Sequence, residues 1–143
     1  AEVSRLGHAA VAVGVGRSAL VAATRYAAER KQFKKPIERF QAIQWMQADS
    51  ATELDGARLL VRKAAWLLAT GRPAGVTIAM AAVRACAIAQ RIADRAIQIH
   101  GGYGYTRDFP VERAYRDATA LGLLDGGAAR NRVVIARGLV AAM

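Results

Sequence analysis

The segment from residue 75 to residue 100 carries the most regular apolar pattern in the chain. Its apolar side chains recur every three or four residues, at Ile78, Ala81, Ala85, Ile88, Ile92, Ala96 and Ile99. The opposite side of the same helical period carries Arg84, Arg91 and Arg95. This spacing predicts an amphipathic helix that buries one face against other helices. The Gly101-Gly102 pair marks its end, because glycine enters the left-handed conformation without a steric penalty.

Weaker helical patterns, separated by turn residues, fill the rest of the chain. The first predicted helix runs from residue 4 to about residue 33 and stops at Lys34-Lys35-Pro36, and its apolar stripe is Leu6, Ala10, Val13, Leu20, Ala23 and Ala27. Gly14 and Gly16 lie inside this pattern, where glycine costs about 1 kcal/mol relative to alanine, so a close approach by a backbone or a ligand is expected there. Further helices are predicted at about 41–70, from Pro110 onward, and at about 128–140.

Composition favours the same kind of fold. Alanine and leucine are abundant, proline is scarce, and a sheet would call for more β-branched and aromatic residues. Long amphipathic helices with tight connections therefore predict an all-α protein, an antiparallel four-helix bundle with a short extra helix. We expect residues 1–143 to form one domain.

Several classes of function find no support in these residues. No apolar run approaches the ~18–20 residues of a membrane span, so no membrane partner is expected. The first residues also lack the pattern of a signal peptide. No metal site is predicted, because His8 and His100 lie far apart and Cys86 has no partner at ligand spacing. A base-reading helix or an aromatic platform is missing, so no nucleic-acid partner is expected.

The formal net charge of +10 indicates only which kinds of partner are possible. A basic excess permits a phosphate-bearing cofactor or substrate, and it is equally explained by a solvated basic face. The single cysteine, Cys86, cannot form an internal disulfide and is expected to be a small buried hydrophobe. This cysteine usage fits a reducing compartment, and we expect a cytoplasmic location.

Three stretches carry more specific information. They are RYAAERKQFKKPIERFQAIQ (25–44), QIHGGYGYTRDFPVERAYRDA (98–118) and LLDGGAARNRVVIAR (123–137). Taken alone, the paired glycines are more often a helix cap than a cofactor contact, and Arg30 is more often a surface charge. Together and in this order, the stretches resemble motifs of the C-terminal helical domain of the acyl-CoA dehydrogenase family. The resemblance covers nearly the whole chain.

The resemblance implies a domain of an oxidoreductase that binds FAD non-covalently, between domains and across a subunit interface. The positions that match the family's FAD contacts are Arg30, Gln32, Phe33, Gln41, Gln98, Gly101 and Gly102. Among them, Arg30 would meet the pyrophosphate, to which a guanidinium makes a forked, charge-assisted pair. Gln98 and the two glycines would lie along the adenosine-diphosphate part of the cofactor.

The resemblance also places a catalytic base. Asp125 occupies the position where most of the family carries the glutamate that removes the α-proton of an acyl thioester, while the β-hydride passes to the flavin. A nearly dry carboxylate has a raised pKa and is a usable base, which we expect of Asp125. Some relatives place their glutamate at the position of Ser4. Arg5 matches a position near the substrate's thioester, and Arg137 closes the motif, so both are candidate substrate-binding residues.

Two departures from the family pattern leave alternatives open. Aspartate is shorter than glutamate by roughly 1.5 Å, about one bond, and a misplacement of that order can cost about 10²-fold in rate. Some relatives nevertheless use an aspartate base, including the nitroalkane oxidases. The family's polar residues after the base are replaced by Gly127, Ala128 and Ala129. The expected function is therefore α,β-dehydrogenation of an acyl thioester, with a related flavin reaction (nitroalkane oxidation, or oxidation of an acyl-carrier-protein thioester) or a non-catalytic oligomerising scaffold as alternatives.

The partners implied follow from the family's architecture. An acyl-CoA or another acyl thioester is the expected substrate, and electron-transfer flavoprotein is a candidate electron acceptor. The family's N-terminal helical domain and middle β domain would precede residue 1, so this chain alone is expected to be inactive. We expect a homo-oligomer, a dimer or a tetramer, or a heteromer with a chain that carries the missing domains.

Overall fold

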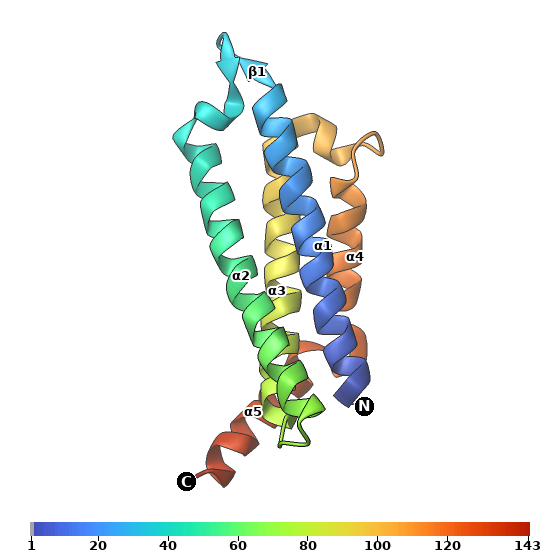
Figure 1. Cartoon of the computed structure of the whole chain (residues 1–143). Coiled ribbons are helices and arrows are strands. Elements are labelled where there is room, and N and C mark those ends of the chain that lie inside the picture. Colours follow the sequence, from blue (N-terminus) through green and yellow to red (C-terminus); the bar gives the residue numbers. More distant parts are fainter. Residues whose placement is uncertain (1) are drawn as a thin grey trace.

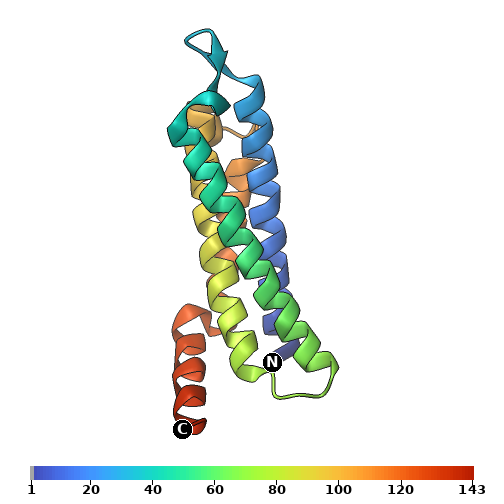
Figure 2. The same ribbon diagram turned by 60° about the vertical axis from the view of Figure 1, so that its left-hand side comes forward.

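The computed structural model describes residues 2–143 as a helical bundle (Figure 1). Its helices are α1 (Glu2–Glu29), α2 (Gln41–Ala69), α3 (Gly75–His100), α4 (Val111–Leu121) and α5 (Gly127–Ala141). Short 3-10 turns, η1 (Ile37–Arg39), η2 (Gly101–Tyr105) and η3 (Leu124–Gly126), lie between them, together with a two-stranded hairpin of β1 (Lys31–Gln32) and β2 (Lys35–Pro36). Helices α1 to α4 alternate in direction along the bundle, and α5 leaves its lower end (Figure 2). The predicted four-helix bundle with a short extra helix is confirmed.

Helix α3 is the centre of the bundle, because it contacts all four other helices. Every residue of its predicted stripe is buried, and the large side chains Ile78, Ile88 and Ile92 are at most 1% exposed. Around them the core consists mainly of alanines, whose small side chains let neighbouring helices approach closely. The 26-residue length of α3 matches the predicted range from 75 to 100.

The two glycines of α1 have different surroundings. A Cβ on Gly16 would lie 3.4 Å from the Cα of Ala89, so α1 and α3 approach backbone to backbone at this point, as expected for a mid-helix glycine. A Cβ on Gly14 would meet no atom of the described residues within 4 Å. The described residues supply such a close approach at Gly16 and none at Gly14, where an approach by a ligand or another chain stays a prediction.

The predicted end and facing of the first helix need correction. Helix α1 ends at Glu29 rather than near Phe33, because the chain turns into the hairpin, where Phe33 (φ 51°) and Lys34 (φ 65°) adopt left-handed conformations. Ala10 is exposed, whereas Ala9 and Ala12 are fully buried. In a helix this rich in alanine the apolar residues cover all sides, so the pattern alone does not identify the buried face.

Helix length and mean hydropathy give a different result from the expectation based on uninterrupted apolar runs. Within residues 2–143, Glu2–Glu29 and Gly75–Tyr105 are long enough and reach a mean hydropathy of 1.4. Half of the most apolar window of the second segment is buried inside the bundle, and α1 packs alongside it. The burial of a core helix accounts for the apolar character of α3.

Candidate functional site

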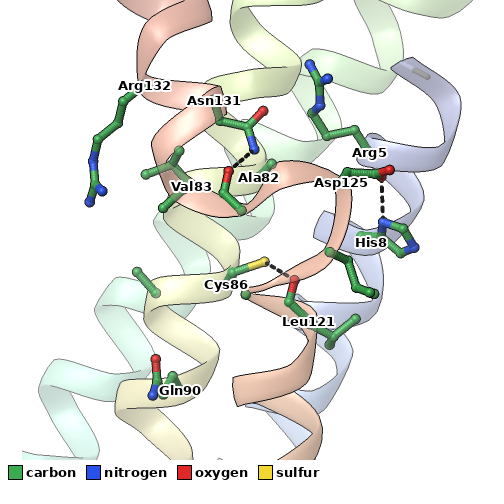
Figure 3. Close-up of a pocket in the computed structure, with 15 residues that line it drawn as sticks. Arg5, His8, Ala82, Val83, Cys86, Gln90, Leu121, Asp125, Asn131 and Arg132 are labelled. Atoms are coloured by element: carbon green, nitrogen blue, oxygen red, sulfur yellow. Dashed lines mark hydrogen bonds and ion pairs between the residues drawn. The ribbon is translucent and has the colours of Figure 1, made fainter.

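A first cavity lies where α1, α3, α4 and α5 meet (Figure 3). Its volume is about 240 Å³. Helix α1 contributes Arg5 and His8 to its wall, and the turn before α5 contributes Asp125. The remaining lining residues are Ala82, Val83, Cys86, Ala87, Gln90, Leu121, Gly122, Leu124, Gly127, Ala128, Asn131 and Arg132. The predicted base Asp125 and the predicted substrate residue Arg5 therefore line one cavity.

The local backbone turns Asp125 toward α1. Asp125 (φ 52°), Gly126 (φ 83°) and Gly127 (φ 61°) are three consecutive residues in the left-handed region. The carboxylate oxygen Oδ2 accepts hydrogen bonds from Ser4 Oγ at 3.1 Å and from His8 Nδ1 at 2.8 Å. By the resemblance, some relatives carry the basic glutamate at the position of Ser4 and most carry it at the position of Asp125. Ser4 and Asp125 are in contact here. The two positions at which the resemblance implies a base are therefore in contact.

Arg5 supplies a cation to the same cavity. Its side chain is only 7% exposed, and its Nε has no hydrogen-bond partner within residues 2–143. A buried donor without a partner is costly, so this nitrogen is suited to an acceptor that enters the cavity. The prediction that Arg5 binds substrate is compatible with this geometry.

The expected raised pKa of Asp125 is wrong for this structure. The hydrogen bond from Ser4 is the largest influence and lowers the pKa of Asp125, and the hydrogen bond from His8 and the nearby charges of His8 and Arg5 lower it further. Partial burial opposes these effects without reversing them, since 32% of the Asp125 side chain is exposed. Asp125 is therefore ionised at neutral pH, which a proton acceptor requires.

Replacing Ser4 by alanine is expected to raise the pKa of Asp125, because the ionised form loses a hydrogen bond that the protonated form needs less. A carbon-13 NMR titration of the Asp125 carboxyl measures this directly. The lowered folded-state pKa also means that Asp125 stabilises the fold above the pKa of an unfolded aspartate. That contribution is lost as the pH falls through the folded-state pKa, and Ser4→Ala reduces it. The exposed Ser18→Ala on α1 is the matched control, and an unchanged Asp125 titration in Ser4→Ala would contradict the assigned cause.

Two further polar residues line this cavity, Asn131, which the sequence did not single out, and Cys86. Asn131 is buried, and its Nδ2 donates to the Gly127 carbonyl oxygen at 2.8 Å, which fixes the first turn of α5. Cys86 is half-buried rather than buried, and its Sγ lies 3.7 Å from the Leu121 carbonyl oxygen. Burial raises the pKa of the Cys86 thiol, which keeps it protonated at neutral pH.

The second cavity, of about 450 Å³, lies at the C-terminal end of α3. Five of the seven predicted FAD-contact residues line it, namely Arg30, Gln32, Gln98, Gly101 and Gly102. The others are elsewhere in the structure: Phe33 is 86% exposed at the hairpin tip, and Gln41 is exposed at the start of α2. Arg137 lies on the exposed part of α5 and does not line either cavity. The roles assigned to these three residues stay predictions.

The wall of the second cavity includes His100, which the sequence did not identify. His100 is 3% exposed, its Nδ1 donates to the Ala96 carbonyl oxygen at 2.7 Å, and its ring stacks on Tyr26 with centroids 4.2 Å apart. Burial lowers the pKa of His100, so the ring is neutral at neutral pH. This aromatic pair supports the end of α3, where the paired glycines follow.

The second cavity has donors that suit a phosphorylated ligand. Arg30 brings a guanidinium, and Gln32 and Gln98 bring amides. Gly101 has a φ of 60°, and a Cβ on either Gly101 or Gly102 would point into open space. The absence of side chains there lets a ligand approach the backbone closely.

Comparison with known proteins agrees with these features. The family model described as acyl-CoA dehydrogenase, C-terminal domain, matches residues 1–140. The probable acyl-CoA dehydrogenase YngJ of Bacillus subtilis is 48% identical over 136 residues, which are 95% of this chain and 36% of the relative. Benzylmalonyl-CoA dehydrogenase of Aromatoleum aromaticum is 50% identical over 118 residues, 82% of this chain and 31% of the relative.

A solved structure gives the same result. Butyryl-CoA dehydrogenase from Megasphaera elsdenii superposes with a TM-score of 0.96 at 37% identity, over 97% of this chain and 36% of the other. The chain thus spans about a third of the length of the relatives it matches.

Proposed function

Because this chain belongs to the acyl-CoA dehydrogenase family, whose C-terminal domain it forms, we propose that it supplies the base and part of the FAD site of an oxidoreductase that dehydrogenates acyl-CoA thioesters between Cα and Cβ. The observation that carries the proposal is the convergence of Arg30, Gln32, Gln98 and the two glycines on one cavity. These residues come from two segments far apart in the sequence, and only the fold brings them together.

The residues of the first cavity are proposed to handle the proton. Asp125 is ionised, and its Oδ1 accepts no hydrogen bond from the described residues, so this oxygen is free to take the α-proton. Bound FAD would accept the hydride from the β-carbon. Arg5 places a buried positive charge beside the carboxylate and keeps the cavity polar at this wall. Asp125 then holds the proton until it is released to solvent.

The residues of the second cavity are proposed to hold the cofactor. Arg30 would pair with the pyrophosphate, and Gln32 and Gln98 would donate amide hydrogens to it or to the ribose. The cavity accommodates only a part of FAD, which agrees with a site completed by further domains or a neighbouring subunit. The remaining predicted contacts, Phe33 and Gln41, would face such a neighbour from the hairpin and from α2.

The reverse reaction is a second candidate, because several curated relatives are named reductases. They include the acryloyl-CoA reductase of Anaerotignum propionicum, 43% identical over 134 residues. The caffeyl-CoA reductase–Etf complex subunit CarC of Acetobacterium woodii is 45% identical over 134 residues. In that direction Asp125 would donate a proton to Cα. A non-catalytic scaffold is the third candidate, favoured by the apolar stretch Gly127–Ala129 next to Asp125.

The proposed partners follow the same family. We propose an acyl-CoA substrate, an electron-transfer flavoprotein as electron acceptor, and assembly as a homo-oligomer or with a chain that carries the other domains. The complex named for CarC and the ChsE4–ChsE5 complex of Mycobacterium tuberculosis support such assemblies. Exposed apolar side chains on α2, Trp45, Leu59 and Trp66, support burial of that face in an assembly. We propose a cytoplasmic location, with no metal, membrane or nucleic-acid partner.

Replacing Arg30 by alanine is expected to weaken FAD binding by about 10- to 100-fold, because a charge-assisted hydrogen bond is lost. The full assembly, this chain with the family's other domains, is titrated with FAD in a calorimeter, and the visible flavin spectrum is recorded. Arg25→Ala, an exposed arginine on α1 that does not line the cavity, is the matched control. Equal affinities of Arg30→Ala and the unmodified assembly would rule out the proposed pyrophosphate contact. If the unmodified assembly bound no FAD at all, the non-catalytic scaffold would be the remaining candidate function.

A further inference from the structure

We propose that His8 is a positioning residue for Asp125: together with Ser4 it holds one carboxylate oxygen, so that the other stays free to exchange a proton with the substrate. This inference rests on the proposed role of Asp125 as the base. It adds a residue to which neither the family resemblance nor the sequence pattern gives a role.

The two donors come from one face of α1. Ser4 and His8 are four residues apart, which is about one helical turn. Both reach the same oxygen, Oδ2, at 3.1 Å and 2.8 Å, while Oδ1 accepts nothing from residues 2–143. An ionised carboxylate can only accept, so His8 carries its proton on Nδ1. Figure 3 shows this ring directly below the Asp125 carboxylate.

Asp125 needs such support because its own turn provides none. Within the described chain, both hydrogen bonds to its carboxylate come from α1. Its backbone lies in the left-handed region between Leu124 and two glycines, and 32% of its side chain is exposed. An aspartate reaches less far than a glutamate, so a small rotation moves its free oxygen away from the substrate. Positional errors of about 1 Å can cost up to about 10²-fold in rate.

Each group that faces the Asp125 carboxylate acts on it in a different way. Helix α1 presents Arg5 and His8, α3 presents Cys86, α5 presents Arg132, and α4 contributes the apolar Leu121. Arg5 acts on Asp125 through its charge, without a hydrogen bond to it. Losing the His8 hydrogen bond therefore changes both the orientation and the pKa of Asp125, while Ser4 and Arg5 still favour its ionised form.

The experiment compares three His8 variants in the FAD-loaded enzyme. In His8→Asn the side-chain Nδ2 stands near the place of the imidazole Nδ1, so its hydrogen bond to Asp125 is kept. In His8→Gln the amide reaches the place of Nε2 instead, and His8→Val removes the donor. We expect His8→Val and His8→Gln to lower kcat on the order of 10-fold with little change in KM, because positioning acts on the transition state. We expect His8→Asn to retain most of the activity.

The pH dependence adds a readout that a merely structural residue would not change. The acidic limb of kcat/KM follows the ionisation of Asp125, so it moves to higher pH when His8 no longer stabilises the carboxylate. The carbon-13 titration of the Asp125 carboxyl in the chain shows the same direction without any turnover. Ser18→Val, an exposed polar-to-apolar change on the same helix, is the matched control.

The outcomes distinguish this inference from the proposed function. Should Asp125→Asn be inactive while His8→Val and His8→Gln keep the unmodified kcat and acidic limb, the role of His8 is overturned and the base stands. Equal losses in His8→Asn and His8→Val would also overturn it, because the hydrogen bond would then not be the cause. Full turnover in Asp125→Asn would overturn the proposed function, and the inference with it. His8→Gln keeps a polar residue on the helix, so the test holds even where valine disturbs folding.

Discussion

Replacing Asp125 by asparagine lowers the kcat of the FAD-loaded enzyme by about 10²–10⁴-fold, the usual contribution of a general base. The amide has nearly the shape of the carboxylate, and its oxygen can still accept hydrogen bonds from Ser4 and His8. It cannot take up the α-proton, so the loss is chemical rather than structural. Because the interaction exists only in the transition state, kcat and kcat/KM should fall together.

The decrease is measured as substrate-driven bleaching of the flavin in the absence of oxygen. Asp117→Asn is the matched control, because Asp117 is an exposed aspartate on α4 that lines neither cavity. The FAD content should be equal in both variants, since neither Asp125 nor Asp117 lines the second cavity. Bleaching of Asp125→Asn at the unmodified rate would refute the base and favour the scaffold.

Replacing Ile92 by alanine lowers the free energy of unfolding by about 2–5 kcal/mol, the range for a large buried side chain cut to alanine. Ile92 is 1% exposed on the central helix. Its Cδ1 lies 3.6 Å from the point where Gly16 would carry a Cβ, so it fills the space at the crossing of α1 and α3. Leu54 Cδ1 approaches the same point at 3.3 Å, whereas Gly16 and Ala89 place no longer side chain there.

Urea unfolding followed by circular dichroism measures this loss as a lower midpoint with an unchanged slope. Val21→Ala is the matched control, because Val21 is 51% exposed on α1 and its truncation should change stability by less than about 0.5 kcal/mol. Equal midpoints for the two variants would mean that the α1–α3 crossing is not a rigid part of the core.

Helix α3 was the most predictable element, because its two faces differ clearly in polarity. Isoleucines recur on one face and arginines on the other, so the period identifies both the helix and its buried side. The glycine pair then ends it, with Gly101 at a φ of 60°. Helix α1 lacks this difference in polarity between its faces, so its buried face was predicted poorly. Its end at Glu29 was also predicted poorly. The hairpin after α1 depends on the left-handed conformations of Phe33 and Lys34, and no local sequence pattern predicts these conformations.

The candidate site was predictable where it follows motifs and unpredictable where it depends on contacts. Asp125 and Arg30 were identified from motif positions. His8 was not identified, although its spacing of four residues from Ser4 was visible and would have placed both on one face of α1. The pKa of Asp125 was expected to be raised from the general behaviour of buried carboxylates. The structure reverses the direction, because donors on a helix more than a hundred residues away in sequence face the carboxylate.

By itself the sequence determined the all-α class, the extent of α2 and α3, the family, and the residue types available for proton and phosphate chemistry. These properties depend on short-range periodicity and on local motifs, both of which can be read from neighbouring residues. Only the tertiary structure decided that Arg30 and Gln98 line one cavity, that Asp125 faces Ser4 and His8, and that Gly16 rather than Gly14 marks a close helix crossing. Those relations join residues on different helices, and they arise from the packing of helix faces, which no local sequence window contains.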